Sequence, residues 1–258
     1  MKLTLLGCGG SGGVPIAARE PGGYWGACDP AEAKNRRSRV SVLVEQEDTA
    51  VLIDTSPDLR QQILDNGILR IDAVLFTHAH ADHCHGLDEL RGMSHGRSHA
   101  IPAFMDETTH RLLTARFAYA FASSADPQSL YRPLMSDRVI DGPFSIGPIP
   151  VTPFEQTHGP EMSLGYRLGP VAYSTDVTEL DEAAFRALEG VKVWVVDCLR
   201  YRPHPTHAHL AQSLEWIERV APERAVLTHL NHEIDYQDLR RRCPPGVEPG
   251  YDGLVIEV

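Results

Sequence analysis

The 258-residue sequence has few cysteines, no long hydrophobic run and no excess of basic residues. Its five cysteines are far apart and no two form a CxxC pair, which argues against a disulfide-stabilised extracellular protein. No apolar stretch reaches the length of a membrane-spanning helix, and the N-terminal MKLTLLGCGG has too few apolar residues for a signal peptide. We therefore expect a soluble, cytoplasmic protein that does not bind membranes.

The balance of charge is acidic. Lysine and arginine total 24 against 35 aspartates and glutamates, which gives a formal net charge of −11. Such a chain repels nucleic acids at long range, so an anionic ligand needs a local positive centre. A basic cluster at Arg36, Arg37 and Arg39 is either a solvated loop or a surface that phosphate approaches. Nucleic acid is therefore not an expected partner.

Short apolar segments alternate with helical ones along the chain. Segments such as 50–54 and 72–78 are brief and rich in Val, Ile and Leu, as buried strands are. Amphipathic stretches lie between such segments, for example 206–222, which ends at a proline. This alternation predicts an α/β layered fold in one domain spanning 1–258. The stretch 100–150 departs from the pattern and is expected to be an excursion from the core, such as a lid.

The early LLGCGGSGGVP contains the spacing GxGxxG at Gly7, Gly9 and Gly12. A dinucleotide site also needs a helix directly after the glycines, whose N-terminus binds the pyrophosphate. Here Val14-Pro15 and then REPGGYWG follow, which is a poor helix start. The loop is therefore expected to be a turn after the first strand, whose small residues let the backbone approach a ligand.

The stretch FTHAHADHCHG, residues 76–86, is the most unusual in the chain. Neutral imidazole is the commonest metal ligand. His78 and His80 follow an apolar strand and, two residues apart on an extended segment, can face one ion together. Beyond a turn, Asp82 and His83 can face a second ion. The stretch therefore predicts a metal site.

Three more candidate ligands, His158, Asp176 and His229, also follow apolar segments. Ligands at the ends of several buried strands converge on one rim of a sheet, where α/β proteins build their sites. A catalytic zinc site offers three protein ligands and an open position for water. The seven residues divide into two such triplets with one bridging carboxylate, which predicts two divalent ions. Imidazole and carboxylate suit zinc and tolerate manganese.

HxHxDH with a later His, Asp and His resembles the metallo-β-lactamase superfamily of dinuclear metallohydrolases, over nearly the whole chain. The resemblance implies a four-layer αββα sandwich. It also implies that His78, His80 and His158 hold one metal, that Asp82, His83 and His229 hold the other, and that Asp176 bridges the two. The segments GSGGVP, LIDTSPDLR, YSTD, THAHL and LTHLNHEID resemble its phosphodiesterase branch, which includes the phosphoribosyl cyclic phosphodiesterases of the carbon–phosphorus lyase pathway.

In that branch a histidine before the last helix contacts the substrate phosphate, and His207 matches it by resemblance. His207 also lies at the expected start of a helix, where free N–H groups favour an anion and an imidazolium could protonate the leaving alkoxide. His204 and His209 are rivals for this role. The branch also carries a structural zinc site of several cysteines and a histidine. Only Cys28 and His232 remain here, so that third metal is not expected.

Two residues are expected to act from outside the ligand set. Asp54 ends the segment AVLID, where it either orients a ligand histidine by accepting its free N–H or simply forms a turn. His232 is the second residue expected to support the ligand set without binding the metals itself. Asp82 and His207 are the expected catalytic groups, with His207 also binding substrate.

Two divalent ions, two carboxylates and a shared hydroxide leave a single positive charge, which complements the single negative charge of a phosphodiester. The expected function is therefore metal-dependent hydrolysis of small cyclic or nucleotide-like phosphodiesters by a metal-bridging hydroxide. Thioester or lactam hydrolysis, RNA processing and a non-catalytic accessory role are the alternatives. The expected partner is a small phosphodiester or nucleotide, and the chain could form a homodimer.

Overall fold

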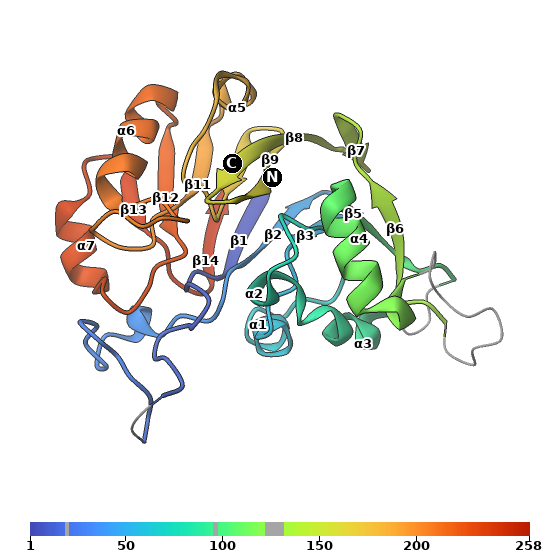
Figure 1. The fold of residues 1–258 in the computed structure, drawn as a ribbon, viewed down its shortest axis with the longest axis horizontal. Coiled ribbons are helices and arrows are strands. Elements are labelled where there is room, and N and C mark those ends of the chain that lie inside the picture. The colour runs from blue at the N-terminus through green and yellow to red at the C-terminus, as the bar shows by residue number, and fades with distance from the viewer. Residues whose placement is uncertain (19–20, 95–97, 122–131) are drawn as a thin grey trace.

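The computed structural model describes residues 1–18, 21–94, 98–121 and 132–258. Its strands form two sheets (Figure 1). The first sheet has the order β14 (Leu254–Glu257), β1 (Lys2–Gly7), β2 (Ser41–Gln46), β3 (Thr49–Ile53), β4 (Ala73–Leu75), β5 (Ile101–Met105) and β6 (Met135–Val139). The second has the order β13 (Val247–Pro249), β12 (Arg224–Thr228), β11 (Val193–Asp197), β10 (Val171–Ser174), β9 (Glu161–Leu168), β8 (Ile149–His158) and β7 (Phe144–Ile146).

Helices cover the outer face of each sheet (Figure 1). On the first sheet they are α1 (Leu59–Asp65), α2 (Ala81–Cys84), α3 (Arg91–Ser94) and α4 (Glu107–Arg116), and on the second α5 (Glu182–Leu188), α6 (Leu210–Val220) and α7 (Tyr236–Arg242). One hydrophobic cluster joins the inner faces of the two sheets, and two others lie between each sheet and its helices. The structure is therefore the four-layer αββα sandwich that the family resemblance implies.

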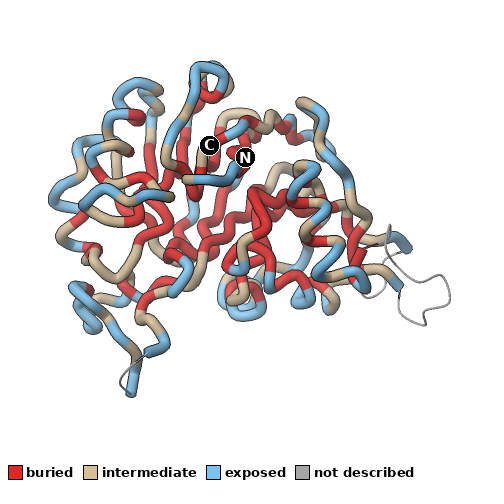
Figure 2. The backbone as a smooth tube through the Cα atoms, viewed as in Figure 1, coloured by how far each residue is buried: buried red, intermediate tan, exposed pale blue. Residues whose placement is uncertain are grey.

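The strand sequences follow from this layering. Both faces of each central strand are covered, so these strands are continuous apolar runs rather than alternating ones. Every residue of β11, VWVVD, is buried, for example. Figure 2 shows the buried backbone gathered in the strands and the exposed backbone in the outer helices and loops. In the described residues, no helix is both long and apolar enough to cross a bilayer.

The excursion predicted over 100–150 differs from the structure. β5 and β6 continue the first sheet in parallel, and β7 joins the second. β5 alternates buried and half-buried residues, a pattern that a search for continuous apolar runs overlooks. Within this stretch 122–131 lie outside the described residues, so a lid remains a prediction, as does the single domain.

Parallel strands bring their carboxyl ends to one edge. In the second sheet Ser174 of β10 pairs with Val196 of β11, and Asp197 of β11 pairs with Thr228 of β12. In the first sheet Ile53 of β3 pairs with Leu75 of β4. The segments that follow these strands therefore start side by side at one rim of the sandwich.

Three residues at this rim leave their strands with a left-handed backbone. Asp54 has a φ of 62°, Asp176 of 54° and His229 of 58°. Non-glycine residues seldom adopt this region, because the Cβ atom crowds the backbone. Such strain collects at functional sites, where the surrounding structure enforces it. Here it turns three polar side chains off the ends of buried strands.

Candidate metal centre

All seven predicted ligands come together at the rim. His78 and His80 follow β4, Asp82 and His83 lie in α2, His158 ends β8, Asp176 follows β10 and His229 follows β12. Ligand atoms lie within 4.8 Å of one another in three groups: His78, His80, His158 and Asp176; Asp82, His83 and His229; Asp176, His207 and His229. The first two groups match the two predicted triplets, with Asp176 joined to the first.

Asp176 directs one oxygen at each triplet. Its Oδ2 lies 3.7 Å from His78 Nε2 and 3.5 Å from His158 Nε2. Its Oδ1 lies 3.2 Å from His83 Nε2 and 3.3 Å from His229 Nε2. The carboxylate therefore stands where a bridge between two ions would be.

The other two candidate ligands complete the two groups. His80 Nδ1 lies 3.4 Å from His158 Nε2 in the first. Asp82 Oδ2 lies 3.4 Å from His83 Nε2 and 3.7 Å from His229 Nε2 in the second.

Buried nitrogen atoms without partners support metal binding at these positions. In the described residues, His78 Nε2, His83 Nε2 and His229 Nε2 are buried and have no hydrogen-bond partner. Buried polar atoms in folded proteins are normally paired, and an unpaired one needs an explanation such as an absent ion. Imidazole and carboxylate donors together suit divalent zinc-like ions. The residues present therefore fit two divalent metals.

Contacts from outside the ligand set leave Nε2 facing the cluster on three of the five candidate histidine ligands. Asp54 contacts His83 Nδ1 at 2.7 Å, the Thr206 carbonyl oxygen contacts His158 Nδ1 at 2.6 Å, and Thr77 Oγ1 contacts His78 Nδ1 at 3.0 Å. The partner of one ring nitrogen fixes which nitrogen faces a metal. In each case Nε2 is left for the ion. Asp54 thus lies where the sequence predicts, as the partner of a candidate ligand.

Two outer residues were missed by the sequence analysis. Asp197, fully buried, lies 3.2 Å from His207 Nδ1 and 3.9 Å from His229 Nδ1. It ends an apolar strand, the same signal that identifies Asp176, and could have been found that way. Glu161, whose carboxylate lies 3.1 Å from His80 Nε2, had no such signal because it begins a strand.

Two buried imidazoles of the candidate centre have raised pKa values. Burial lowers the pKa of His83, but the carboxylates of Asp176, Asp82 and Asp54 raise it well above its usual value. Burial likewise lowers the pKa of His229, but the carboxylates of Asp176, Asp82 and Asp197 together raise it to about 9.

Metal binding should therefore release protons. A pH of 7 lies below the raised pKa values of His83 and His229, so both rings are expected to carry a second proton. A metal binds only the neutral ring, so that proton must leave when the metal binds. We expect at least two protons to leave per loaded centre, one from each imidazole and more where the shared water ionises, and the metal affinity to rise with pH up to about 9. Calorimetric zinc titrations in buffers of different ionisation enthalpy measure the released protons. Heats that do not depend on the buffer would contradict this prediction.

Of the three histidines considered for contact with the substrate phosphate, His207 is the best placed at the cavity. Its ring stacks on that of His229 at 4.6 Å and contacts that of His158 at 5.0 Å. His204 lies behind it, 5.2 Å away ring to ring, and His209 is the N-cap residue of α6. The helix start predicted at His207 is wrong, because His209 still pairs as a strand bridge with Arg200 and the helix begins at Leu210. No helix N-terminus therefore assists His207.

The cavity over the centre has a volume of about 220 Å³. Ser11, Glu161 and His207 line it together with candidate ligands. The glycine loop closes directly on the centre, since a Cβ at Gly10 would lie 3.2 Å from Leu199 and 3.5 Å from the His229 ring. The small residues of this loop thus let its backbone approach the site, as the sequence predicts.

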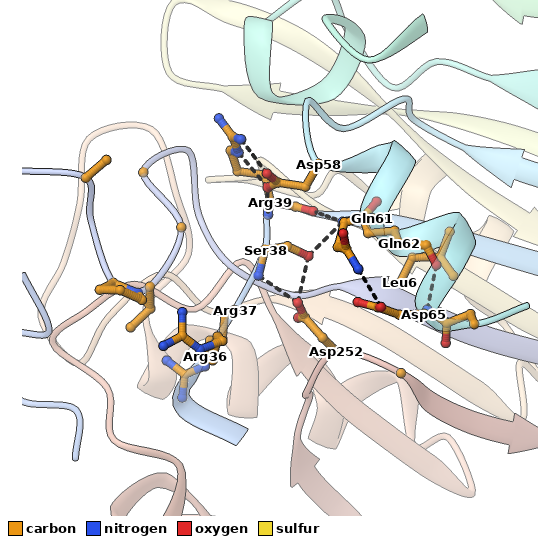
Figure 3. A pocket seen from close by; sticks show the side chains of 17 residues that line it. Leu6, Arg36, Arg37, Ser38, Arg39, Asp58, Gln61, Gln62, Asp65 and Asp252 are labelled. Carbon is orange, nitrogen blue, oxygen red and sulfur yellow. Dashed lines mark hydrogen bonds and ion pairs between the residues drawn. The ribbon is translucent and has the colours of Figure 1, made fainter. Parts of the chain in front are cut away.

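The basic cluster does not form one free patch. A separate hollow of about 570 Å³, shown in Figure 3, is lined by Arg36, Arg37 and Arg39. Arg39 donates two hydrogen bonds to Asp58, at 2.7 and 2.6 Å. Buried Arg37 donates to the carbonyl oxygen of Ile234 at 2.8 Å. Arg36 lies over the Trp25 ring. Most of this positive charge is therefore engaged within the protein.

The structure does not place His232 beside the centre. In the described residues its ring contacts Tyr24 at 5.3 Å and no candidate ligand, so the predicted outer role is wrong. Its carbonyl oxygen and that of Ile234 accept from Cys28 Sγ. The guanidinium of Arg37 lies 3.9 Å from the same sulfur. A cation already beside Cys28 disfavours a metal ion at that position.

Comparisons with known proteins agree with this fold. The beta-lactamase superfamily domain model matches residues 49–230. A diphosphatase of the PhnP family is 32% identical, with a TM-score of 0.89, over 100% of this chain and 97% of that chain. Zinc-bound PqqB from Methylobacterium extorquens, at 19% identity and a TM-score of 0.76 over 100% of both chains, shares the fold.

An octanoyltransferase of Porphyromonas gingivalis is 34% identical over 257 residues, which is 98% of this chain and 51% of that protein. The chain therefore spans about half the length of the curated relative that it matches.

Proposed function

The chain belongs to the metallo-β-lactamase superfamily, and on that premise we propose that it is a phosphodiesterase acting on small cyclic or nucleotide-like phosphodiesters. The fold and the His/Asp cluster support a metal-dependent hydrolase. The observation that carries the proposal is Asp176, whose two oxygens face two groups of ligands. A dinuclear centre of zinc or manganese would sit there.

The chemistry that bound ions supply is well defined. Two divalent ions would be held by His78, His80 and His158, by Asp82, His83 and His229, and by Asp176 between them, and would lower the pKa of a shared water and polarise phosphoryl oxygens. The negative charge of Asp82 would help to balance the positive charge of the two ions. Burial raises its pKa, but His83 and His229 lower it well below the usual range, so Asp82 stays ionised and can accept a hydrogen bond from that water.

His207 can supply the proton for the leaving group. Its Nδ1 is 3.2 Å from the buried carboxylate of Asp197, which also accepts from the backbone N–H of Val177. A carboxylate at Nδ1 fixes the tautomer and the orientation of the ring. The ring lines the cavity, so it is placed to donate to a phosphoryl oxygen or to the departing alkoxide.

Replacing His207 with alanine should lower kcat without removing metal. A general acid contributes roughly 10²- to 10⁴-fold, so we expect kcat on bis-p-nitrophenyl phosphate to fall about a hundredfold or more. His204→Ala and His209→Ala are matched controls, since neither residue lines the cavity, and each should retain most activity. Zinc content confirms that the centre is intact. A larger loss in either control would reassign the role.

Thioester hydrolysis is a second candidate because the octanoyltransferase relative handles acyl groups. The chain matches only about half of that protein, so its named activity can reside in the other half. Assays of bis-p-nitrophenyl phosphate beside S-lactoylglutathione, an octanoyl thioester and a chromogenic cephalosporin separate the candidates. The proposal predicts turnover of the diester, and turnover of a thioester alone would overturn it.

A further inference from the structure

The hairpin of β8 and β9 places one more carboxylate at the cavity. Its turn pairs His158, the last residue of β8, with Glu161, the first of β9. His158 is a candidate ligand, and the Glu161 side chain lines the cavity beside it. Residues paired across antiparallel strands lie close together. The same turn therefore fixes both side chains relative to the centre.

Glu161 lies at the open side of the centre. Its side chain is 59% exposed and contacts His80, which is 44% exposed, whereas Asp176 is 3% exposed. His80 directs Nδ1 at His158 and Nε2 at Glu161, so one imidazole ring separates this carboxylate from the ligand cluster. Among the described acidic residues that line the cavity, Asp82 and Asp176 are candidate ligands and Glu161 is not.

We propose that Glu161 determines specificity by charge, so that the site accepts monoanionic internal phosphodiesters and disfavours dianionic terminal phosphates. This inference rests on the proposed phosphoryl chemistry of the centre. The carboxylate of Glu161 adds a negative charge at the open side of the cavity. Glu161 is not one of the candidate ligands, so this charge is additional to the charges of the ligand set. A ligand with one negative charge is still neutralised by the centre, whereas a second negative charge would lie against Glu161.

The same charge would assist release of product. Hydrolysis of a phosphodiester by water breaks one P–O bond, forms another, and yields an alcohol and a phosphomonoester. A phosphomonoester has a second pKa of about 6 and is largely dianionic at pH 8. Glu161 therefore repels the product more than the substrate, which limits product inhibition.

The test is a binding experiment that needs no turnover. Zinc-loaded wild-type protein, Glu161→Gln and Glu161→Asp are titrated with inorganic phosphate and with dimethyl phosphate at pH 8, at saturating zinc and with zinc content measured. Glu155→Gln is the matched control, since Glu155 is an exposed acid of the same hairpin that does not line the cavity.

Glu161→Gln should bind phosphate about five- to tenfold more tightly, as expected for removing a partly screened charge, and dimethyl phosphate less than about threefold more tightly. Glu161→Asp and Glu155→Gln should bind both anions like wild type. Unchanged phosphate binding in Glu161→Gln, equal tightening for both anions, or tightening in Glu161→Asp would each overturn the inference. Failure of the wild type to hydrolyse any diester would instead overturn the proposed function. The binding experiment needs no turnover, so the two failures can be told apart.

Discussion

Replacing Asp176 with alanine should abolish hydrolysis and weaken metal binding at both positions. Asp176 is the residue whose two oxygens face two ligand groups, with four imidazole nitrogens within 3.7 Å of them. Losing a bridging carboxylate removes a shared ligand and leaves the charge of both ions less balanced. Since ions supply several kcal/mol of transition-state stabilisation, we expect kcat to fall about a thousandfold or more. Zinc content and kcat on bis-p-nitrophenyl phosphate measure the two effects.

Asp176→Asn is the matched variant, because it keeps the shape of the side chain and loses the charge. It should also lose activity, since an amide can offer an oxygen to one ion but not to both. Circular dichroism and urea unfolding confirm that each variant is folded. Two zinc ions bound with wild-type affinity to Asp176→Ala would show that Asp176 does not bridge them.

Removing the metals from the wild-type protein should both stop hydrolysis and lower thermal stability. The metal-free centre leaves three buried Nε2 atoms without partners in the described residues and holds charged imidazoles close together. A ligand present at a thousand times its dissociation constant stabilises the folded state by about 4 kcal/mol. For a chain of this size, that corresponds to a shift of Tm of about 10 °C.

Thermal unfolding followed with and without a chelator measures this shift, and adding back zinc or manganese should restore both Tm and activity. The metal that restores more activity at equal occupancy identifies the better cofactor. A Tm that is the same with and without chelator would indicate that the cluster is held by protein contacts alone.

Much of the candidate centre could be predicted from the sequence, because its residues follow buried strands. His78, Asp176 and His229 each follow a short buried strand within three residues, and parallel pairing within each sheet carries those strand ends to one rim. The αββα layering follows from the same apolar runs and from the family resemblance. The structure brings the seven residues together, while their role as ligands stays a prediction.

Other features depended on tertiary contacts that no local pattern encodes. Glu161 reaches the cavity through the register of a hairpin, and its own sequence context is that of an ordinary exposed strand residue. His232 stands out in the sequence because it matches the histidine of the branch's structural zinc site, yet its ring lies against that of Tyr24. The sequence around Arg37 suggests a solvated basic loop. In the structure Arg37 is buried, and it donates a hydrogen bond to the carbonyl oxygen of Ile234, far along the chain.

The left-handed backbone at Asp54, Asp176 and His229 has a consequence for how this protein can evolve or be engineered. Each such residue costs about 1 to 3 kcal/mol of folding free energy, which glycine would recover. Glycine at these positions would relieve the strain, but it would also remove a buried side chain whose contacts, such as those of Asp54 with Thr77 and His83, hold the rim together. The strain is therefore tied to the chemistry of the centre, and stabilising substitutions should be sought in the outer helices and loops instead.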